Sequence, residues 1–322
     1  MSNTSPNIDP SVPIVEVAAA VIIKPDGSFL LTCRPEGKPY SGFWEFPGGK
    51  IEPNEAPLHA LDRELQEELG IQVKQVYPWL TRIFTYSHAT VRLHFFRVTK
   101  WHGEPWARED QKLSWQLPCA VNVTPMLPAN APILRVLSLP PVYAITHASE
   151  LGVDVALSQI ERALQNGLRF IQVREKNMDE DTLCIFSNQV ISLAHHFDAE
   201  VLVNSNVAFS REVGADGVHL TSSQLMTLSA RPDAEYGWCG ASCHNAEELF
   251  AAEQLGVDFV VLGPVLPTLS HPDSTPMGWR KFAALIQGYS LPVYALGGLR
   301  QEDLATAQEL GAHGIAIMRA MV

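Results

Sequence analysis

The stretch GKIEPNEAPLHALDRELQEELGI, residues 49 to 71, decides the fold of the first half of the chain. Its leucines recur at spacings of three and four, which predicts the apolar stripe of an amphipathic helix that ends at the following glycine. Glu64 and Glu68 share one helix face, with Glu67 beside them and Arg63 four residues before Glu67. Carboxylates this close repel one another unless cations lie among them, and Mg²⁺ or Mn²⁺ suits oxygen ligands of this kind.

Two interpretations of this helix are open on spacing alone, since glutamate-rich helices are most often solvated surfaces. The whole stretch, however, fits the pattern G-x5-E-x7-R-E-U-x-E-E-x-G-U, in which U is aliphatic. The nine fixed positions that match are Gly49, Glu55, Arg63, Glu64, Leu65, Glu67, Glu68, Gly70 and Ile71. The stretch therefore resembles the Nudix box, and so complete a match favours a metal site over a solvated face.

The resemblance implies a Mg²⁺-dependent hydrolase that cleaves a nucleoside diphosphate linked to another group, with Mn²⁺ as the alternative metal. It also implies that Glu55 pairs with Arg63 to brace the loop. The implied metal ligands are the carboxylates of Glu64, Glu67 and Glu68, the carbonyl oxygen of Gly48, and the carboxylate of Glu109 from a later loop. The implied catalytic residues are Glu64, Glu67 and Arg63. The sequence does not choose between Glu64, Glu67 and Glu109 as the general base.

The flanking sequence extends the resemblance over roughly residues 14 to 137. WEFPGGK precedes the box, and GEPW, a loop glutamate, a tryptophan and PANAPI follow it, in the order found in MutT-type 8-oxo-dGTP diphosphatases. In that group the residue that matches Asn130 hydrogen-bonds the oxidised guanine, and the one that matches Phe46 packs on the base. The residue that matches Arg34 holds the nucleotide.

Each of these substrate-binding residues has a structural alternative. An amide donates and accepts hydrogen bonds side by side, as base reading requires. Asn130 also precedes Ala131-Pro132, however, and would cap a helix there. Phe46 could belong to the core instead of stacking on a base, Arg34 could be a surface cation, and Glu109 taken alone is an ordinary loop acid.

Length and composition predict two globular domains, because 322 residues with 46% hydrophobic content exceed one typical domain. The net charge of −12 argues against a general nucleic-acid binder, which would carry a basic face. Five cysteines without a paired zinc or redox motif, and without a signal peptide, indicate reduced thiols in a cytoplasm. No apolar run is long enough to span a membrane.

We predict an α/β protein with a disordered tail over residues 1–13, a Nudix domain over 14–137, a linker at 138–141 and a second domain over 142–322. The first domain is expected to be an α/β/α mixed-sheet structure. It would begin with a hairpin of residues 15–23 and 29–33 around the turn Pro25-Asp26-Gly27. Strands at 76–86 and 91–99 would follow the acidic helix, with a short helix after Ile133.

In the second half, short apolar runs alternate with helical stretches. The runs lie at residues 142–145, 170–173, 201–203, 217–220, 238–241, 259–262, 293–295 and 314–317, with helices such as 155–166, 182–196, 246–256 and 301–311 between them. This alternation predicts a compact (β/α)8 TIM barrel, whose chemistry would lie at the carboxyl ends of its strands.

Those strand ends carry the candidate ligand-binding residues of the barrel, which are Gln172, Arg174, Lys176, Asn204, His244, Thr268 and Gly298. The pair Gly297-Gly298 would form a phosphate cradle. YxIT, QxREK, GADGVHL, GPVxPT and GG, in this order, resemble the thiamine-phosphate synthase and thiazole tautomerase family.

Departures from the synthase pattern argue against the ligation reaction. Neutral residues stand where the synthases carry acids that bind the Mg²⁺ of the substrate pyrophosphate, at Ser205, Ser223 and Gln224. His271 replaces a lysine, and Arg319 replaces the last serine of the cradle. A degenerate barrel that only binds a phosphorylated ligand is therefore expected. His244 matches a histidine of the tautomerases, so that it would either transfer a proton or make a structural bond.

The sequence thus favours a Mg²⁺-dependent pyrophosphohydrolase that converts 8-oxo-dGTP to 8-oxo-dGMP and pyrophosphate, which would remove a mutagenic nucleotide before DNA replication. The alternative is a thiamine-pathway synthase or tautomerase whose Nudix half acts on pyrimidine pyrophosphates. The expected partners are a nucleotide in the first half and a phosphorylated, thiamine-related ligand in the barrel, with no nucleic acid and no membrane.

Overall fold

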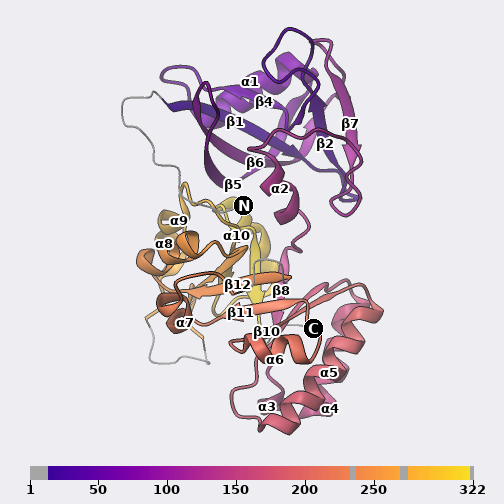
Figure 1. Cartoon of the computed structure of the whole chain (residues 1–322), viewed down its shortest axis with the longest axis vertical. Coiled ribbons are helices and arrows are strands. Elements are labelled where there is room, and N and C mark those ends of the chain that lie inside the picture. Colours follow the sequence, from indigo (N-terminus) through magenta and orange to yellow (C-terminus); the bar gives the residue numbers. More distant parts are fainter. Residues whose placement is uncertain (1–13, 233–236, 269–274, 320–322) are drawn as a thin grey trace. The chain divides into compact units, whose positions relative to one another are not determined.

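The computed structural model describes residues 14–232, 237–268 and 275–319 (Figure 1). The predicted tail (residues 1–13) and His271 lie outside these ranges. Contacts between Cα atoms divide the chain into two compact units, and the first ends at Leu139, inside the predicted linker. None of the described helices is both long enough and apolar enough to cross a membrane.

The described part of the first unit contains two sheets and two helices, which confirms the predicted mixed α/β fold. The larger sheet has the order β4 (Gly48–Lys50), β1 (Ile14–Ile22), β6 (Thr90–His102) and β5 (Gln72–Thr85). In it, β1 is parallel to β6 and antiparallel to β4. The smaller antiparallel sheet has the order β3 (Trp44–Glu45), β2 (Phe29–Cys33) and β7 (Lys112–Gln116). The helices are α1 (Pro57–Leu69) and α2 (Ala131–Val136).

The predicted hairpin between β1 and β2 is wrong. The turn forms, since the Asp26 carboxylate accepts hydrogen bonds from the backbone N–H and the hydroxyl of Ser28 at 2.9 and 2.7 Å. The strands meet only in a bridge between Ile23 and Phe29. Beyond it, β1 pairs with β4 and β6, whereas β2 pairs with β3 and β7. Both strands have apolar faces that need cover, so each takes partners on both of its edges and they diverge into separate sheets.

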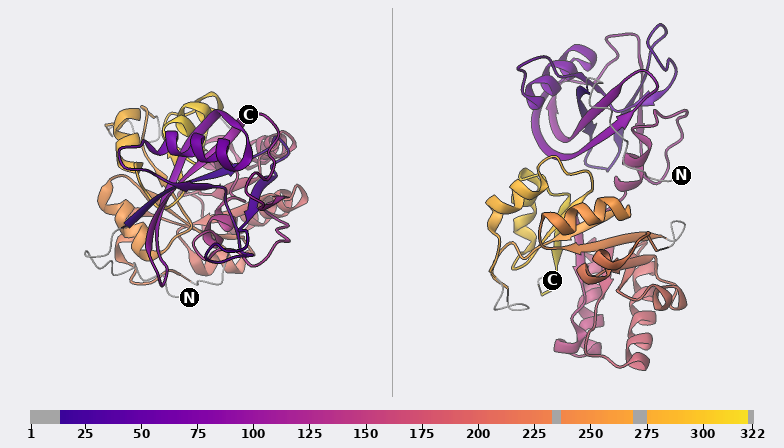
Figure 2. Two further views of the ribbon diagram at one scale, coloured as in Figure 1. Left: turned by 90° about the horizontal axis from the view of Figure 1, so that it is seen from above. Right: turned by 60° about the vertical axis from the view of Figure 1, so that its left-hand side comes forward.

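Helix α1 packs one face on the larger sheet, beside β1 and β4 (Figures 1 and 2, violet). Its buried residues are Ala60, Leu61, Leu65 and Leu69, and they share a core with Ala18, Ala20, Ile22, Phe96 and Val98. Leu58, which the periodicity also assigned to the buried stripe, lies in the first turn and is 43% exposed. Gly70 ends the helix with φ of 68°, as predicted.

Two glycines bring the chain close to both β1 and α1. A Cβ atom on Gly48, which has φ of 139°, would lie 2.1 Å from the carbonyl oxygen of Ala18. A Cβ atom on Gly49 would meet the carboxyl group of Glu64 at 2.2 to 2.5 Å. The absence of side chains at these positions lets β4 pair with β1 and lets the Glu64 carboxylate lie against the backbone.

The second unit is the predicted barrel. Its eight described strands are all parallel and pair in chain order until β15 closes on β8. They are β8 (Val142–Ile145), β9 (Phe170–Val173), β10 (Glu200–Asn204), β11 (Gly217–Leu220), β12 (Trp238–Cys243), β13 (Phe259–Leu262), β14 (Val293–Leu296) and β15 (Gly314–Ile317). Each lies within two residues of its predicted bounds.

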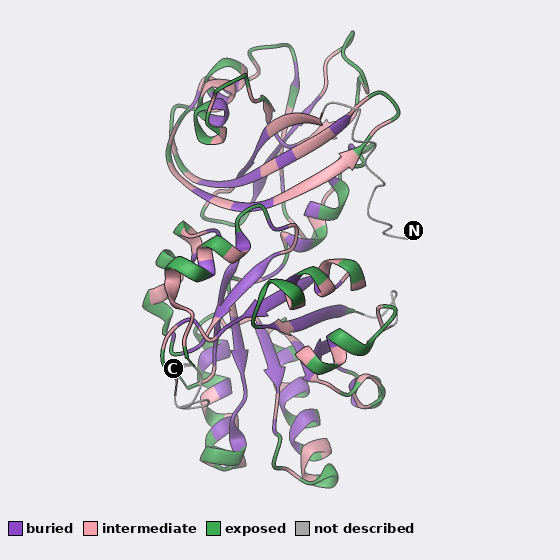
Figure 3. Ribbon diagram, turned by 90° about the vertical axis from the view of Figure 1, so that its left-hand side faces the viewer, coloured by how far each residue is buried: buried purple, intermediate pink, exposed green. Residues whose placement is uncertain are grey.

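Helices cover the outside of the barrel, and Figure 3 shows buried strands with helices whose outer faces are exposed. They are α3 (Ala148–Leu151), α4 (Val153–Gln165), α5 (Glu180–His196), α6 (Val207–Glu212), α7 (Ser222–Thr227), α8 (Ala246–Leu255), α9 (Gly278–Ile286), the 3-10 turn η1 (Gln301–Asp303) and α10 (Leu304–Glu309). Inside, the fully buried rings of Tyr143, Phe170, Phe259 and Tyr294 pack with centroids 4.5 to 6.4 Å apart. These rings fill the barrel, so that it is a packed core with room for a ligand only at an end.

We expect Gly48→Ala to lower the free energy of unfolding of the first unit by about 3 kcal/mol, because the new methyl group would collide with the Ala18 carbonyl at a strained φ. Gly27→Ala is the matched control, since Gly27 has φ of 83° but open space around it. It should cost only about 1 kcal/mol. Calorimetric unfolding of the two variants would measure the difference, and equal losses would contradict a steric role for Gly48.

Candidate active site and barrel cavity

Arg63 holds three of the acids that the Nudix pattern contains. Its Nε and Nη2 atoms donate to the two carboxylate oxygens of Glu55, each at 2.9 Å, which confirms the expected brace. Its Nη1 atom donates to Glu64 at 2.7 Å and to Glu67 at 3.3 Å. Hydrogen bonds from Arg63 and from the backbone N–H of Glu52 lower the pKa of Glu55 to about 2. The loop before α1 is therefore tied to the helix through one guanidinium group.

Glu68 lies among other acids in a partly buried position. Its carboxylate accepts a hydrogen bond from the backbone N–H of Gly48 at 3.3 Å. Burial raises the pKa of Glu68 to about 7, and the nearby charges of Glu45, Glu109 and Glu64 raise it further, while the Gly48 hydrogen bond opposes the shift. The cluster thus holds more negative charge than its own cations neutralise.

The predicted metal ligands form a donor set that fits a hard divalent cation, because they are carboxylates and a carbonyl crowded at one place. In the described residues no three acidic, histidine or cysteine side chains already converge on one point. Arg63 holds Glu64 and Glu67, and the ammonium group of Lys38 donates to Glu109 at 2.6 Å. Protein cations therefore occupy these carboxylates, and a metal would have to exchange with them.

A cluster of polar and aromatic groups lies near these acids, since the charge of Glu45 acts on Glu68. The Nε atom of Arg34 lies 2.9 Å from the carboxylate of Glu45, so that Arg34 is partnered and not a free surface cation. Burial raises the pKa of Glu45 to about 7, against the opposing charge of Arg34. The ring of Tyr86 lies 5.4 Å from that of Tyr40, and burial raises the pKa of Tyr86 to about 12.

The sequence left two roles open for each of Asn130 and Phe46, namely substrate binding or a structural role, and the structure distinguishes between them. Asn130 is only 3% exposed and occupies the N-cap position of α2, but its side chain makes no capping hydrogen bond. The capping alternative therefore does not account for this residue. Phe46 is also 3% exposed, and its ring packs 5.9 Å from that of Phe29 and 5.8 Å from that of Phe95. The structure thus gives Phe46 the core role.

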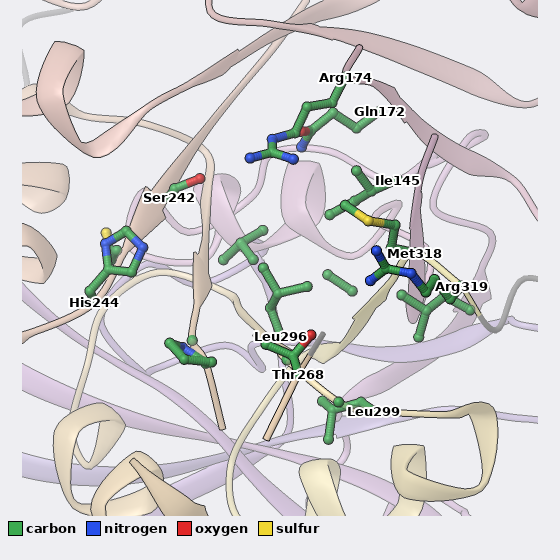
Figure 4. Close-up of a pocket in the computed structure, with 18 of the residues that line it drawn as sticks. Ile145, Gln172, Arg174, Ser242, His244, Thr268, Leu296, Leu299, Met318 and Arg319 are labelled. Carbon is green, nitrogen blue, oxygen red and sulfur yellow. The ribbon is translucent and has the colours of Figure 1, made fainter. Parts of the chain in front are cut away.

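A cavity of about 560 Å³ opens at the carboxyl ends of the barrel strands (Figure 4). Five of the predicted residues line it, namely Gln172, Arg174, His244, Thr268 and Gly298. Lys176 is exposed and lies outside the lining. Asn204 also lies outside it, where its amide donates to the side chain of Gln172 at 3.4 Å and to the carbonyl of His219 at 3.3 Å. It therefore orients the cavity wall.

The described lining of this cavity carries arginine and histidine but no aspartate or glutamate. The guanidinium group of Arg319 is one of the groups around it (Figure 4), and it donates to both carboxylate oxygens of Glu150 at 3.1 and 2.5 Å. Burial lowers the pKa of Arg174. Gln224, at a position of the missing acids, instead forms a capping box with Thr221 and donates to the carbonyl of Ser205 at 2.6 Å.

Two histidines of the cavity lie in different surroundings. The Nδ1 atom of His244 lies 2.8 Å from the carboxylate of Glu248, which also accepts from the His244 backbone N–H at 2.7 Å. This arrangement fixes the ring and leaves Nε2 as the free nitrogen. His219 is fully buried, with Nε2 3.0 Å from the hydroxyl of Ser242 and Nδ1 3.4 Å from that of Tyr143. Burial lowers the pKa of His219 to about 3, so that its ring is neutral.

Sequence reasoning did not single out Lys38, Glu45 or Tyr86 as site residues. Lys38 and Glu109 are 71 residues apart, and no local pattern joins them. Glu45 lies within WEFPGG, where an acid between aromatics just before the box was the available signal. Tyr86 stands at the end of a strand-like run, and no sequence signal marked it as a site residue.

Comparisons with known proteins assign both halves. The family model described as "Thiamine monophosphate synthase" matches residues 142–321, and that described as "NUDIX domain" matches residues 13–137. A putative thiamine-phosphate synthase 2 of Aquifex aeolicus is 33% identical over 180 residues, which cover 56% of this chain and 96% of that protein.

Two solved structures illustrate the two halves. Thiamine phosphate pyrophosphorylase from Pyrococcus furiosus is 26% identical with a TM-score of 0.46, covering 55% of this chain and 84% of that one. A MutT structure from the study of Aliivibrio salmonicida and Vibrio cholerae is 31% identical with a TM-score of 0.33, covering 39% of this chain and 97% of that one.

We expect Glu68→Gln to stabilise the metal-free protein at pH 8 but not at pH 5. The folded-state pKa of Glu68, about 7, lies above the ordinary value of 4.5, so the folded protein binds more protons between these pH values. Its stability therefore falls as pH rises through that window. Removing the ionisable group should restore roughly 1 to 3 kcal/mol at pH 8.

Thermal unfolding in a metal chelator would measure this gain. Glu67→Gln is the control, because the Glu67 side chain is 58% exposed. A gain of the same size at pH 5 and pH 8 would contradict the assignment of the effect to Glu68 ionisation.

Proposed function

The chain belongs to the thiamine monophosphate synthase family and carries a Nudix domain in its first half, and from this premise we propose that the Nudix domain hydrolyses 8-oxo-dGTP to 8-oxo-dGMP and pyrophosphate. The observation that carries the proposal is the buried amide of Asn130, which the helix does not use as a cap. A buried amide without a structural task is suited to read a base edge.

The chemistry of the base explains why an amide discriminates. Guanine presents two acceptors, N7 and O6, along its major-groove edge. In 8-oxoguanine N7 carries a hydrogen and becomes a donor, so that the edge offers one donor and one acceptor. The oxygen and the amino group of Asn130 match that edge, whereas dGTP would set the Asn130 oxygen against an acceptor. The rings of Tyr40 and Tyr86 lie in the neighbouring cluster and supply aromatic faces.

The acids of α1 supply the hydrolytic chemistry in this proposal. The groups that would hold Mg²⁺ are Glu64, Glu67, Glu68, Glu109 and the Gly48 carbonyl. When bound, the ion would neutralise the phosphates and lower the pKa of a water molecule. Glu64 is our choice for the group that accepts the proton, because it lies against Gly49 and Arg63 fixes its carboxylate. Glu55 holds Arg63 from the other side and keeps this group oriented.

Pyrophosphate release with Mg²⁺ from 8-oxo-dGTP, dGTP, ADP-ribose and the pyrimidine pyrophosphate of thiamine synthesis tests this function. We expect 8-oxo-dGTP to be preferred, and Glu64→Gln to lower its kcat by about 10²-fold or more. A preference for the pyrimidine pyrophosphate would overturn the proposal and unite both halves in thiamine metabolism.

Asn130→Ala should reduce the preference for 8-oxo-dGTP over dGTP by about 10- to 100-fold, since a good pair of hydrogen bonds to a base edge is worth about 1 to 3 kcal/mol. Asn130→Asp keeps the size but offers only acceptors, and it should lose the preference too. Asn166→Ala, in the barrel, is the control. The ratio of kcat/KM values is the measurement, and an unchanged ratio would remove Asn130 from base reading.

For the barrel we propose binding of a phosphorylated ligand without a metal ion. The observation that favours it is a cavity with Arg174, Arg319 and the Gly297-Gly298 backbone in its lining but no described carboxylate. Titration calorimetry should detect inorganic phosphate in the presence of a chelator, and Arg319→Gln should weaken binding about tenfold. Arg162→Gln, on α4, is the control. Binding that requires Mg²⁺ would contradict this assignment.

A further inference from the structure

The loop between β2 and β3 is anchored over the acidic site. Its ends are closed by a hydrogen bond from the backbone N–H of Gly42 to the carbonyl of Arg34 at 3.0 Å. Near its centre the ring of Tyr40 packs 5.4 Å from that of Tyr86 and 5.9 Å from that of His88. These contacts hold the loop in place, so that Lys38 near its tip has a defined direction.

Lys38 reaches the acid that a metal would need. Its Nζ atom donates to an oxygen of Glu109 at 2.6 Å, and the charge of Glu68 also acts on it. The two side chains are 48% and 42% exposed. An exposed ion pair of this kind contributes only about 0 to 1 kcal/mol, so that separating it costs little.

The other cations of the site are bound more firmly. Arg63 is shared by three carboxylates, and Arg34 pairs with Glu45, whose side chain is 26% exposed against 42% for Glu109. Lys38, with one half-exposed partner, is therefore the cation that can leave most readily. Its ammonium group sits on a flexible four-carbon stem and can turn to a new anion nearby.

We propose that Lys38 is a further substrate-binding residue, which releases Glu109 to the divalent cation and transfers its ammonium group to the polyphosphate of the substrate. Glu109 cannot serve both cations at close range, because the ammonium group and the metal repel each other. The polyphosphate is the anion that arrives with the metal at this site. The inference rests on the proposed polyphosphate hydrolysis, but it does not depend on which base the substrate carries.

This exchange has a consequence that a structural role would not have. If Lys38 competes with the metal for Glu109, Lys38→Met should strengthen metal binding in the absence of substrate. If Lys38 also holds the polyphosphate, the same variant should weaken substrate binding. One substitution therefore acts in opposite directions on the two ligands.

The experiment measures both ligands with probes that contain no nucleobase. We expect Lys38→Met to bind Mn²⁺ about 3- to 10-fold more tightly in the nucleotide-free protein, as counted by electron paramagnetic resonance. Binding of pyrophosphate at saturating Mg²⁺, measured by titration calorimetry without any nucleotide, should weaken about tenfold. Lys38→Arg keeps the charge and should retain most of the pyrophosphate affinity, while Lys74→Met, which removes an exposed lysine that bonds Gln72, should change neither.

Weaker Mn²⁺ binding in Lys38→Met would overturn the proposal, because it would mean that Lys38 positions Glu109 as a ligand. Unchanged pyrophosphate binding would overturn it as well, since Lys38 would then only pair with Glu109 and would not hold the polyphosphate. Because neither probe carries a base, a failure of the 8-oxo-dGTP assignment would appear in the nucleotide panel and leave this result intact.

Discussion

The repulsion among the carboxylates of α1 is the constraint on which the first unit depends. The amphipathic face of α1 must lie on β1 and β4 to be buried, and this packing carries Glu64 and Glu68 into a partly buried place beside Gly48 and Gly49. Burial then opposes ionisation of Glu68. Arg63 relieves part of the repulsion by binding Glu64, Glu67 and Glu55 at once. The fold therefore holds charges that it does not itself balance, which is the electrostatic condition for recruiting a divalent cation.

The fold was predictable wherever the relevant signal lay within one element. The barrel strands are short apolar runs bounded by turns, and their alternation with helices determines both the parallel pairing and the chain order of the barrel. The pairing of β1 and β2 was not predictable in this way. The turn at Asp26 is a correct local signal, but partners of a strand are chosen by which apolar faces need cover, and β4 and β6 come from distant sequence.

The same distinction divides the site residues. Glu55, Arg63, Glu64, Glu67 and Glu68 lie on one loop and helix, so their spacing fixes which side chains meet. The contact between Lys38 and Glu109 joins two loops and has no local signature. Burial also decides questions that residue type leaves open, since Phe46 packs between Phe29 and Phe95, whereas Asn130 is buried without capping its helix. In the barrel, Asn204 lies at a strand end as predicted, but it does not line the cavity and instead donates a hydrogen bond to Gln172.

In the functions proposed above, the two units present opposite charges to ligands of the same chemical class, which carry phosphate groups. In the proposed hydrolysis, phosphate groups would approach the acids of α1 only if metal ions reversed the charge of the site, so that the reaction would depend on a divalent cation. The barrel cavity carries Arg174 and Arg319 in its described lining, and it offers an anion positive charge directly. Glu150 already neutralises Arg319 through a bidentate pair, so the proposed phosphate ligand would compete with a carboxylate for the same guanidinium group. The Nudix site contains a similar ion pair, in which Glu109 accepts a hydrogen bond from Lys38. In each case the carboxylate pairs with a cation that would otherwise bind the phosphate. The free energy needed to separate this ion pair would therefore weaken phosphate binding.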